Sequence, residues 1–349
     1  MRIAQIAPLV ESVPPQKYGG TERVVSGLTE ELVRRGHEVV LFASGDSDTA
    51  AELVACCERG LRLDGSAHDF HAYTMIQLAM VYERADEFDL IHPPVDYFAF
   101  PFARLSRTPT VTTMHGRLDL PEVRRVHGFF TELPLISISD AQRENLQRAH
   151  WVATVNNGID LNRFTFRPEP GDYLAFLGRI SPEKRLDRAI EIARAVGMPL
   201  RVAAKIDAAD REYDEHAIKP LMGHPLVEFV GEVDEEHKDA FLGSAYAYLF
   251  PIDWPEPFGI TMIEAMATGT PVIAMACGAV PEVVEHEVTG FVCHDLRGMI
   301  ECVERVPEIS RDACRRHVAR RFSAEIMTTQ YERAYAAVGG DHMRAPIPA

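Results

Sequence analysis

The stretch that decides the fold is AYAYLFPIDWPEPFGITMIEAMATGTPVIAMA, residues 245–276. AYAYLFP is typical of a strand, and IDWPEP is typical of a loop. GITMIEAMA is typical of a helix with Ile260, Ile263 and Ala267 on one face, and TPVIAMA predicts a second strand. A strand, a helix and a strand in this order indicate a parallel pair joined by a crossover helix.

The rest of the chain alternates in the same way. A first series of strand patterns runs from RIAQIAP at the start to LPLISIS at 133–139, and a second begins with DYLAFLG at 172–178. Between them, NNGIDLNRFTFRPEPGD is rich in turn residues and reads as a connection. We therefore predict an α/β protein of two doubly wound domains joined near residue 165.

Composition excludes several classes of protein. The net charge is −16, with 36 basic and 52 acidic residues, which disfavours a nucleic-acid binder. Residues 1–165 carry 16 basic and 22 acidic side chains, a net charge of −6, and so offer no net attraction to anionic lipids. No apolar run approaches the roughly 18 residues of a membrane span, although peripheral contact with a membrane stays open. MRIAQIAPLV predicts a first strand and no secretory signal, and six cysteines without C-x-x-C spacing fit reduced thiols in a cytoplasmic protein.

The first candidate anion site is the loop YGGTE. Gly19 and Gly20 precede a helix pattern, where glycine lets an anion approach the backbone and the helix N-terminus supplies N–H donors. The loop is not G-x-G-x-x-G, so the fingerprint of a dehydrogenase is missing. An ordinary turn and a phosphate site fit the glycine pair equally well.

A second candidate lies in GRISPEKRLD, residues 178–187. Ser181 suits an N-cap and Pro182 the first helical position, which would place Lys184 in the first turn, close to Arg179. The helix dipole disfavours a cation there, so an anion between the two cations would explain them. The alternative is that they pair with local carboxylates such as Glu183 or Asp187.

Glu256 and Glu264 flank the apolar run of the opening stretch. The pattern places Glu256 in the loop beyond a strand and Glu264 about one turn or more inside the following helix. A carboxylate among apolar neighbours is costly unless it accepts good hydrogen bonds, and the hydroxyls of two sugars would supply them. The alternatives are a capping role for Glu256 and a buried salt bridge for Glu264.

Together these pieces resemble the family 4 retaining glycosyltransferases, whose GT-B architecture has two Rossmann-like domains facing across a cleft. The matching motifs follow in order along nearly the whole chain: YGGTERVV, RRGHEV, TTMHG, SISDAQ, NNGIDLNRF, LGRISPEKRLDRAIEIA, VEFVGEV and EPFGITMIEAMATGTPVIA. The last contains the E-x7-E motif of that family. The resemblance implies an acceptor-side domain of residues 1–165 plus 323–349 and a nucleotide-sugar domain of residues 166–322, with the helix pattern at 323–338 crossing back to the first domain.

The resemblance also implies roles for individual residues. Arg179 and Lys184 would neutralise the donor diphosphate, which Gly19 and Gly20 would approach from the first domain. Glu264 would bind the ribose, and Glu256 would hold a hydroxyl of the transferred sugar. His115 would touch the sugar near the reacting carbon, with a structural histidine as the alternative. Backbone groups would complete the site, those of Phe258, Gly259 and Ile260 at the sugar and those of Gly231, Glu232 and Val233 at the base.

The activity implied is transfer of a hexose to a hydroxyl acceptor with retention, by front-face displacement in which the departing diphosphate takes the acceptor proton. UDP-glucose is the favoured donor, with GDP-mannose as the alternative. No cofactor or metal is expected, because Arg179 and Lys184 would take the place of the metal. Two other functions stay open on the same architecture, a nucleotide-sugar epimerase and a non-catalytic nucleotide-sugar binder.

The sequence leaves the acceptor and the oligomeric state open. A glycan and a small molecule both fit as acceptor, and candidate contacts are the loop residues Asp96, Tyr97, Arg117 and Asp119. Lys205 is either a further phosphate ligand or a surface cation. His92 is a second histidine of undecided role.

Overall fold

The computed structural model describes residues 1–65 and 67–339, and the chain divides into two compact units. Of the described residues, unit 1 contains Met1–Gly158 and Ala324–Gly339, and unit 2 contains Ile159–Ser323. The divisions thus fall after Gly158 and Ser323, where the sequence pattern placed them after residues 165 and 322. Residues 340–349, which the prediction assigned to the first domain, lie outside the described residues.

Unit 1 is built on two parallel sheets, in the orders β3-β2-β1-β4 and β5-β6-β7. A parallel bridge between Ile91 and Thr110 connects them. The strands are β1 (Arg2–Ile6), β2 (Glu38–Ser44), β3 (Glu52–Cys57), β4 (Leu90–His92), β5 (Thr112–Met114), β6 (Leu135–Ser137) and β7 (Trp151–Thr154). The helices of the unit are α1 (Gly20–Arg34), α2 (Phe70–Glu83), α3 (Phe100–Leu105), α4 (Pro121–Phe129), α5 (Asp140–Arg143) and α14 (Ala324–Gly339).

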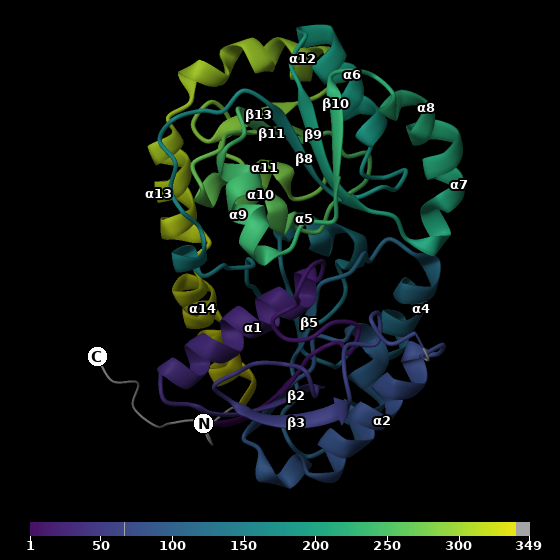
Figure 1. Ribbon diagram of the computed structural model, residues 1–349. Helices are drawn as coiled ribbons and strands as arrows, with labels where there is room; N and C mark the ends of the chain where they lie inside the picture. Colours follow the sequence, from purple (N-terminus) through teal and green to yellow (C-terminus); the bar gives the residue numbers. More distant parts are fainter. Residues whose placement is uncertain (66, 340–349) are drawn as a thin grey trace. The chain divides into compact units, whose positions relative to one another are not determined.

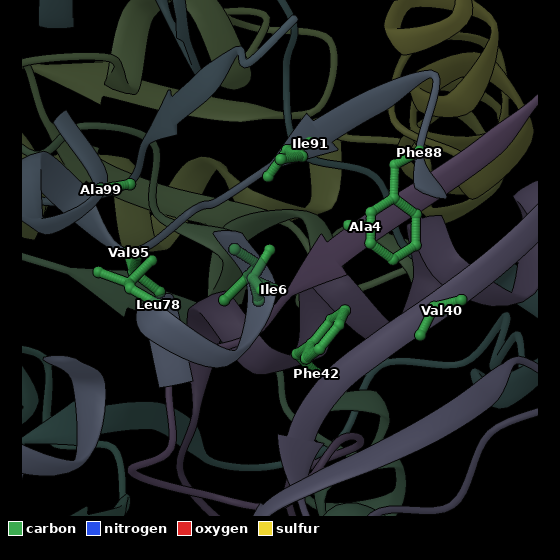
Figure 2. Close-up of a cluster of buried hydrophobic side chains, with 10 residues drawn as sticks. Ala4, Ile6, Val40, Phe42, Leu78, Phe88, Ile91, Val95 and Ala99 are labelled. Carbon is green, nitrogen blue, oxygen red and sulfur yellow. The ribbon is translucent and has the colours of Figure 1, made fainter. Parts of the chain in front are cut away.

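The first sheet of unit 1 is held by an apolar core. Figure 2 shows side chains of β1, β2 and β4 gathered with Leu78 of α2, and Phe42 lies among them fully buried. The contributing strands are mostly apolar and buried, as expected where both faces of a parallel sheet are covered. Burial of a side chain such as Phe42 or Ile6 contributes roughly 1.5–3 kcal/mol.

The last described helix returns to unit 1, as predicted. Helix α14, yellow in Figure 1, packs beside α1, drawn in purple. Arg35, at the end of α1, donates to Glu332 of α14 at 2.6 Å. Tyr331 and Tyr335 of α14 are buried and reach the strands, where the hydroxyl of Tyr335 lies 2.8 Å from Nδ1 of His92. The chain therefore leaves unit 1 once and re-enters it.

Unit 2 is built on one parallel sheet in the order β10-β9-β8-β11-β12-β13. Strands β8, β9 and β10 run side by side in the teal and green part of Figure 1. The strands are β8 (Leu174–Arg179), β9 (Leu200–Lys205), β10 (Val227–Gly231), β11 (Ala247–Phe250), β12 (Val272–Met275) and β13 (Gly290–Cys293). The helices are α6 (Leu186–Val196), α7 (Arg211–Tyr213), α8 (Lys219–Met222), α9 (Glu235–Gly243), α10 (Ile260–Ala267), α11 (Val280–Val283), α12 (Leu296–Arg305) and α13 (Arg311–Arg321).

The strand order places a topological switch point between β8 and β11. From β8 the chain winds outward through β9 to β10, then returns to the other side of β8 as β11 and winds outward through β12 to β13. In open α/β sheets, ligands bind beyond the carboxyl ends of the strands at such a point. The opening stretch of the sequence supplies β11, the loop that follows it, α10 and β12.

The predicted fold class is confirmed, since both units are α/β with parallel sheets. The structure also contains β3, β7 and β13, which the sequence pattern did not predict. Strand β3 lies at the edge of its sheet and is only half-buried, so its sequence lacks the apolar run of the central strands. Among residues 1–65 and 67–339, no helix has the length and apolar character needed to cross a membrane.

Candidate active site

The loops at the switch point of unit 2 carry three of the predicted site residues. Arg179 ends β8, Lys184 lies in the turn that follows, and Glu256 lies in the loop after β11. Because β8 and β11 are parallel neighbours, their carboxyl ends meet at one edge of the sheet. The fold thus places side chains from distant parts of the sequence beside one another.

The helix start predicted at Ser181 and Pro182 is wrong. Helix α6 begins at Leu186, and Arg185 before it has a left-handed backbone, with φ of 55°. A left-handed residue interrupts a helix, so residues 181–184 form a separate turn closed by a hydrogen bond from Lys184 N–H to the carbonyl of Ser181. Lys184 therefore lies outside the helix, and the dipole argument does not apply to it.

Lys184 and Glu256 form an ion pair between the two loops. Trp254 binds both partners, since its Nε1–H donates to Oε2 of Glu256 at 3.0 Å and its ring centroid lies 5.1 Å from the Lys184 ammonium. The side chains of Lys184 and Glu256 are 18 % and 11 % exposed, so solvent weakens this pair less than a surface pair. Trp254 was not among the predicted site residues.

Arg179 lies in an acidic environment. It pairs with Glu183, and its guanidinium reaches Asp207 at 3.5 Å and Asp210 at 3.4 Å. Burial raises the pKa of the Asp210 carboxyl. Pairing of Arg179 with Glu183 was the alternative to an anion site, and the structure contains that pair. An incoming anion would therefore compete with these carboxylates for Arg179.

A second set of ion pairs ties the two loops together. Arg185 donates to Asp253 at 2.6 Å, and Arg188 of α6 donates to the same carboxylate at 3.0 Å. The N–H of Asp253 donates to the carbonyl of Glu183 at 2.9 Å. These contacts fix the loop that carries Lys184 against the loop that carries Glu256.

The N-terminus of α10 presents backbone donors. In the part of the chain that the structure describes, the N–H groups of Phe258, Gly259 and Ile260 have no hydrogen-bond acceptor. Gly259 has φ of 82°, a conformation that favours glycine. Gly278 supports the loop from behind, because a Cβ there would lie 2.3 Å from the Glu256 carbonyl oxygen. The first residues of α10 can thus bind hydroxyl or anionic oxygens.

Glu264 lies deeper, within α10, and is 1 % exposed. Its Oε1 accepts from the Lys238 ammonium at 2.5 Å, and Lys238 also lies 2.6 Å from Oε1 of Glu235. A buried salt bridge was the alternative weighed for Glu264, and the structure contains one. No sequence pattern indicated Lys238, because its spacing from Glu264 has no helical or strand period.

The remaining predicted residues of unit 2 follow β9 and β10. Gly231 ends β10 with φ of 80°, and Glu232 and Val233 follow it, both half-buried. Lys205 ends β9, and its ammonium lies 3.0 Å from Asp207. Its side chain is 12 % exposed, so it is not a surface cation.

In unit 1, the predicted residues again follow strands. Gly19 and Gly20 follow β1 at the start of α1, and His115 follows β5. A Cβ on Gly19 would lie 2.6 Å from the Cβ of Pro15, whereas Gly20 has open space around it. Burial lowers the pKa of His115 to about 4, so its ring is neutral at pH 7.

His92 is a structural histidine. It is 1 % exposed, and its two ring nitrogens lie within 3.0 Å of Gln5, Thr113 and Tyr335. Burial lowers its pKa to about 3, which keeps the ring neutral. With its hydrogen-bonding groups satisfied inside unit 1, His92 has no capacity left for a substrate.

The candidate acceptor contacts lie on either side of His115. Asp96 has φ of 52°, and its carboxylate would lie 3.3 Å from a Cβ placed on Gly116. Burial raises the pKa of Asp96. Tyr97 stacks on Phe98, and Arg117 forms a two-bond pair with Asp119 at 2.9 and 2.7 Å. Asp96 is thus the candidate that the backbone brings next to the TMHG segment.

Comparison with protein families decides the class. The model described as Glycosyltransferase Family 4 matches residues 18–163, and the model described as Glycosyl transferases group 1 matches residues 160–322. The chain belongs to glycosyltransferase family 4. The predicted family is therefore confirmed, and with it the prediction of a glycosyltransferase enzyme.

Relatives and solved structures agree with this assignment. This glycosyltransferase is 26 % identical to glycogen synthase of Mycobacterium tuberculosis (strain ATCC 25618 / H37Rv), over 88 % of the chain and 87 % of the relative. It is also 26 % identical to phosphatidyl-myo-inositol mannosyltransferase of Mycobacterium leprae (strain TN), over 97 % of both chains. Its fold is similar to that of sucrose-phosphate synthase from Thermosynechococcus elongatus, with a TM-score of 0.78, 19 % identity and coverage of 97 % and 98 %. Anabaena HepE in complex with UDP-glucose gives a TM-score of 0.74 at 18 % identity, covering 97 % and 100 %. The GT-B fold is thereby confirmed.

Proposed function

We propose that this glycosyltransferase moves a hexose, with glucose from UDP-glucose as the first choice, to a hydroxyl acceptor with retention and without a metal. The observation that carries the proposal is the pair of Lys184 and Glu256 at the switch point of unit 2. A cation and a carboxylate lie together there, beside the N-terminus of α10. A nucleotide sugar needs both, a cation for its diphosphate and an oxygen acceptor for the sugar hydroxyls.

Charge stabilisation is the main contribution that we assign to this site. As the bond between the anomeric carbon and the phosphate oxygen breaks, negative charge builds on the departing diphosphate. Lys184 and Arg179 would stabilise that charge, which is the part that a metal plays in other transferases. Glu256, held by Trp254, would then be available to a hydroxyl of the sugar.

Retention follows in this proposal from attack on the same face that the diphosphate leaves. The acceptor oxygen forms the new bond to the anomeric carbon, and its proton passes to a diphosphate oxygen. Glu256 and Glu264 both have lysine partners, which suits binding better than nucleophilic attack. We keep His115 as a proposed contact of the donor sugar, and its neutral ring could donate or accept one hydrogen bond.

The donor is proposed partly from the relatives. HepE, with which the chain shares a fold, was crystallised with UDP-glucose, which supports a UDP-linked hexose. The relatives named as mannosyltransferases favour GDP-mannose as the second candidate. Backbone groups of Gly231, Glu232 and Val233 are the proposed base contacts in either case.

NMR spectroscopy of slow donor hydrolysis tests the reaction without knowledge of the acceptor. UDP-glucose is incubated with the enzyme in EDTA, and the anomer of the glucose that appears first is recorded. The proposal predicts α-glucose before mutarotation, whereas β-glucose as the first product would contradict retention. Release of mannose from GDP-mannose, with UDP-glucose intact, would replace the proposed donor.

A further inference from the structure

Lys238 is a buried cation held between two carboxylates of unit 2. It lies on α9, and its ammonium is 2.5 Å from Glu264 on α10 and 2.6 Å from Glu235, one turn earlier on α9. The side chain of Lys238 is 7 % exposed and that of Glu264 is 2 % exposed. The Phe164 ring lies 5.8 Å from the ammonium. A lysine is rarely buried this far unless its charge is needed there.

Lys238 holds the Glu264 carboxylate in place. The neighbours of Glu264 on α10 are apolar and buried, among them Ile263, Ala265 and Met266. Burial of a carboxylate among apolar groups is costly unless it is paired, so without the ammonium the side chain would turn toward water. A carboxylate that moves no longer points its oxygens in a fixed direction.

We propose that Lys238 is a positioning residue for the nucleotide, which keeps Glu264 oriented to accept hydrogen bonds from the ribose hydroxyls. The inference rests on the proposed function, in which Glu264 binds the ribose. A carboxylate has about four lone-pair sites, so pairing with one ammonium leaves it able to accept from hydroxyls. Lys238 itself does not contact the donor in this account.

Glu235 completes the arrangement. It pairs with Lys238 across one helical turn and anchors the ammonium from the α9 side. Arg163 lies 3.3 Å from Oε2 of Glu235, so the two carboxylates are balanced by two cations. The cluster therefore offers no excess positive charge to a diphosphate, which separates the role of Lys238 from that of Lys184.

Calorimetric titration with UDP and with 2′,3′-dideoxy-UDP tests the proposal, because only UDP carries the ribose hydroxyls. We expect the wild type to bind UDP about 10 to 100 times more tightly than the dideoxy compound, the range for hydrogen bonds to a charged group. In Lys238→Met, UDP should bind at most about three times more tightly than dideoxy-UDP, and the affinity for dideoxy-UDP should be nearly unchanged. Lys238→Arg should retain most of the ratio.

A second variant and a control keep the result interpretable. Lys238→Gln keeps a hydrogen-bond donor and most of the volume, so it covers the case in which Lys238→Met does not fold, and it should also lose the ratio. Lys219→Met removes an exposed lysine from the same unit and should leave both affinities as they are.

Two results would overturn the inference. Equal losses for UDP and dideoxy-UDP in folded Lys238 variants would make the lysine purely structural. Tighter UDP binding in those variants would mean that Lys238 competes with the ribose. Failure of the proposed function would be seen in the wild type itself, which would then bind neither UDP nor UDP-glucose.

Discussion

The loop around Glu256 and the helix around Glu264 each hold a glutamate that has little contact with water. Each contains a glutamate paired with a lysine from a distant segment. Glu256 lies in a loop at the carboxyl end of a strand, and its pair with Lys184 keeps some exposure to solvent. Glu264 lies inside α10, and its pair with Lys238 is almost wholly buried.

The difference separates residues that can respond to a substrate from residues that hold a fixed geometry. The Lys184–Glu256 pair joins two loops and can exchange partners when an anion enters. The Lys238–Glu264 pair joins two helices, and breaking it would leave a charge without water or a full set of partners. We therefore expect the first pair to govern turnover and the second to govern nucleotide binding and stability.

The largest expected effect comes from Lys184→Ala. Loss of this cation removes stabilisation of the departing diphosphate, and we expect kcat to fall by about 10²–10³-fold. The melting temperature should fall by less than in Lys238→Met, because this pair is more exposed than that of Lys238 and Glu264 and Trp254 still donates to Glu256. Turnover of UDP-glucose and a thermal melt measure the two quantities, with Lys219→Ala as the control. Full activity in Lys184→Ala would remove Lys184 from the site.

The second prediction concerns stability in the helical region. Lys238→Met takes the lysine partner from the buried Glu264 carboxylate, and we expect it to lower the free energy of unfolding by about 4 kcal/mol. Glu264→Gln leaves Lys238 its pair with Glu235, so its cost should be smaller, about 1 kcal/mol. Urea unfolding of both variants measures the difference. Equal costs would mean that Lys238 is not shared between the two glutamates.

A third prediction uses a buried glutamate without a lysine. Glu22, in the first turn of α1, is 5 % exposed. Burial raises its pKa from 4.5 to about 7, although hydrogen bonds from backbone N–H groups act in the opposite direction. The folded chain thus holds a proton that the unfolded chain releases near pH 4.5. The stability from this group is complete below pH 4.5 and is lost as the pH rises through 7.

Glu22→Gln removes that dependence. Between pH 4.5 and pH 8, the unfolding free energy of the wild type should fall by about 3 kcal/mol relative to that of this variant. Urea unfolding across this range provides the measurement. A difference that stays constant with pH would contradict the raised pKa of Glu22.

The smallest expected effect is that of Trp254→Phe. The variant keeps an aromatic ring beside Lys184 but loses the N–H that donates to Glu256. We expect kcat/KM to fall by about fivefold, equivalent to roughly 1 kcal/mol for one hydrogen bond. Steady-state kinetics with UDP-glucose measure it. A loss as large as that of Lys184→Ala would mean that Trp254 contacts the substrate directly.

Much of the fold could be predicted because its strands carry strong local patterns. AYAYLFP and TPVIAMA are apolar runs bounded by turn residues, and the structure contains β11 and β12 there. Strand β3 was missed, since an edge strand with half-buried side chains has a weak pattern. The start of α6 was misplaced because Arg185 has a left-handed backbone, which the sequence pattern did not predict, and its pair with Asp253 depends on tertiary structure.

The site could be predicted only as far as motif positions allow. Lys184 and Glu256 were named as candidates, but their direct pairing depends on the neighbouring positions of β8 and β11. Lys238 was missed for the same reason, because its pair with Glu264 is set by the packing of two helices. Trp254 lies only two residues from Glu256, but its contact with Lys184 depends on how the two loops meet. The role of His92 could not be predicted from the sequence either. Only its hydrogen bonds in the folded chain show that it is a structural histidine.

The most direct test of the central claim is calorimetric titration of the wild type and Lys184→Ala with UDP-glucose in EDTA, repeated with GDP-mannose and ADP-glucose. The account predicts micromolar binding of one donor, UDP-glucose first, by the wild type and its loss in Lys184→Ala. Binding that needs a divalent metal, or that survives the substitution unchanged, would contradict the assignment of the diphosphate to the switch point between β8 and β11.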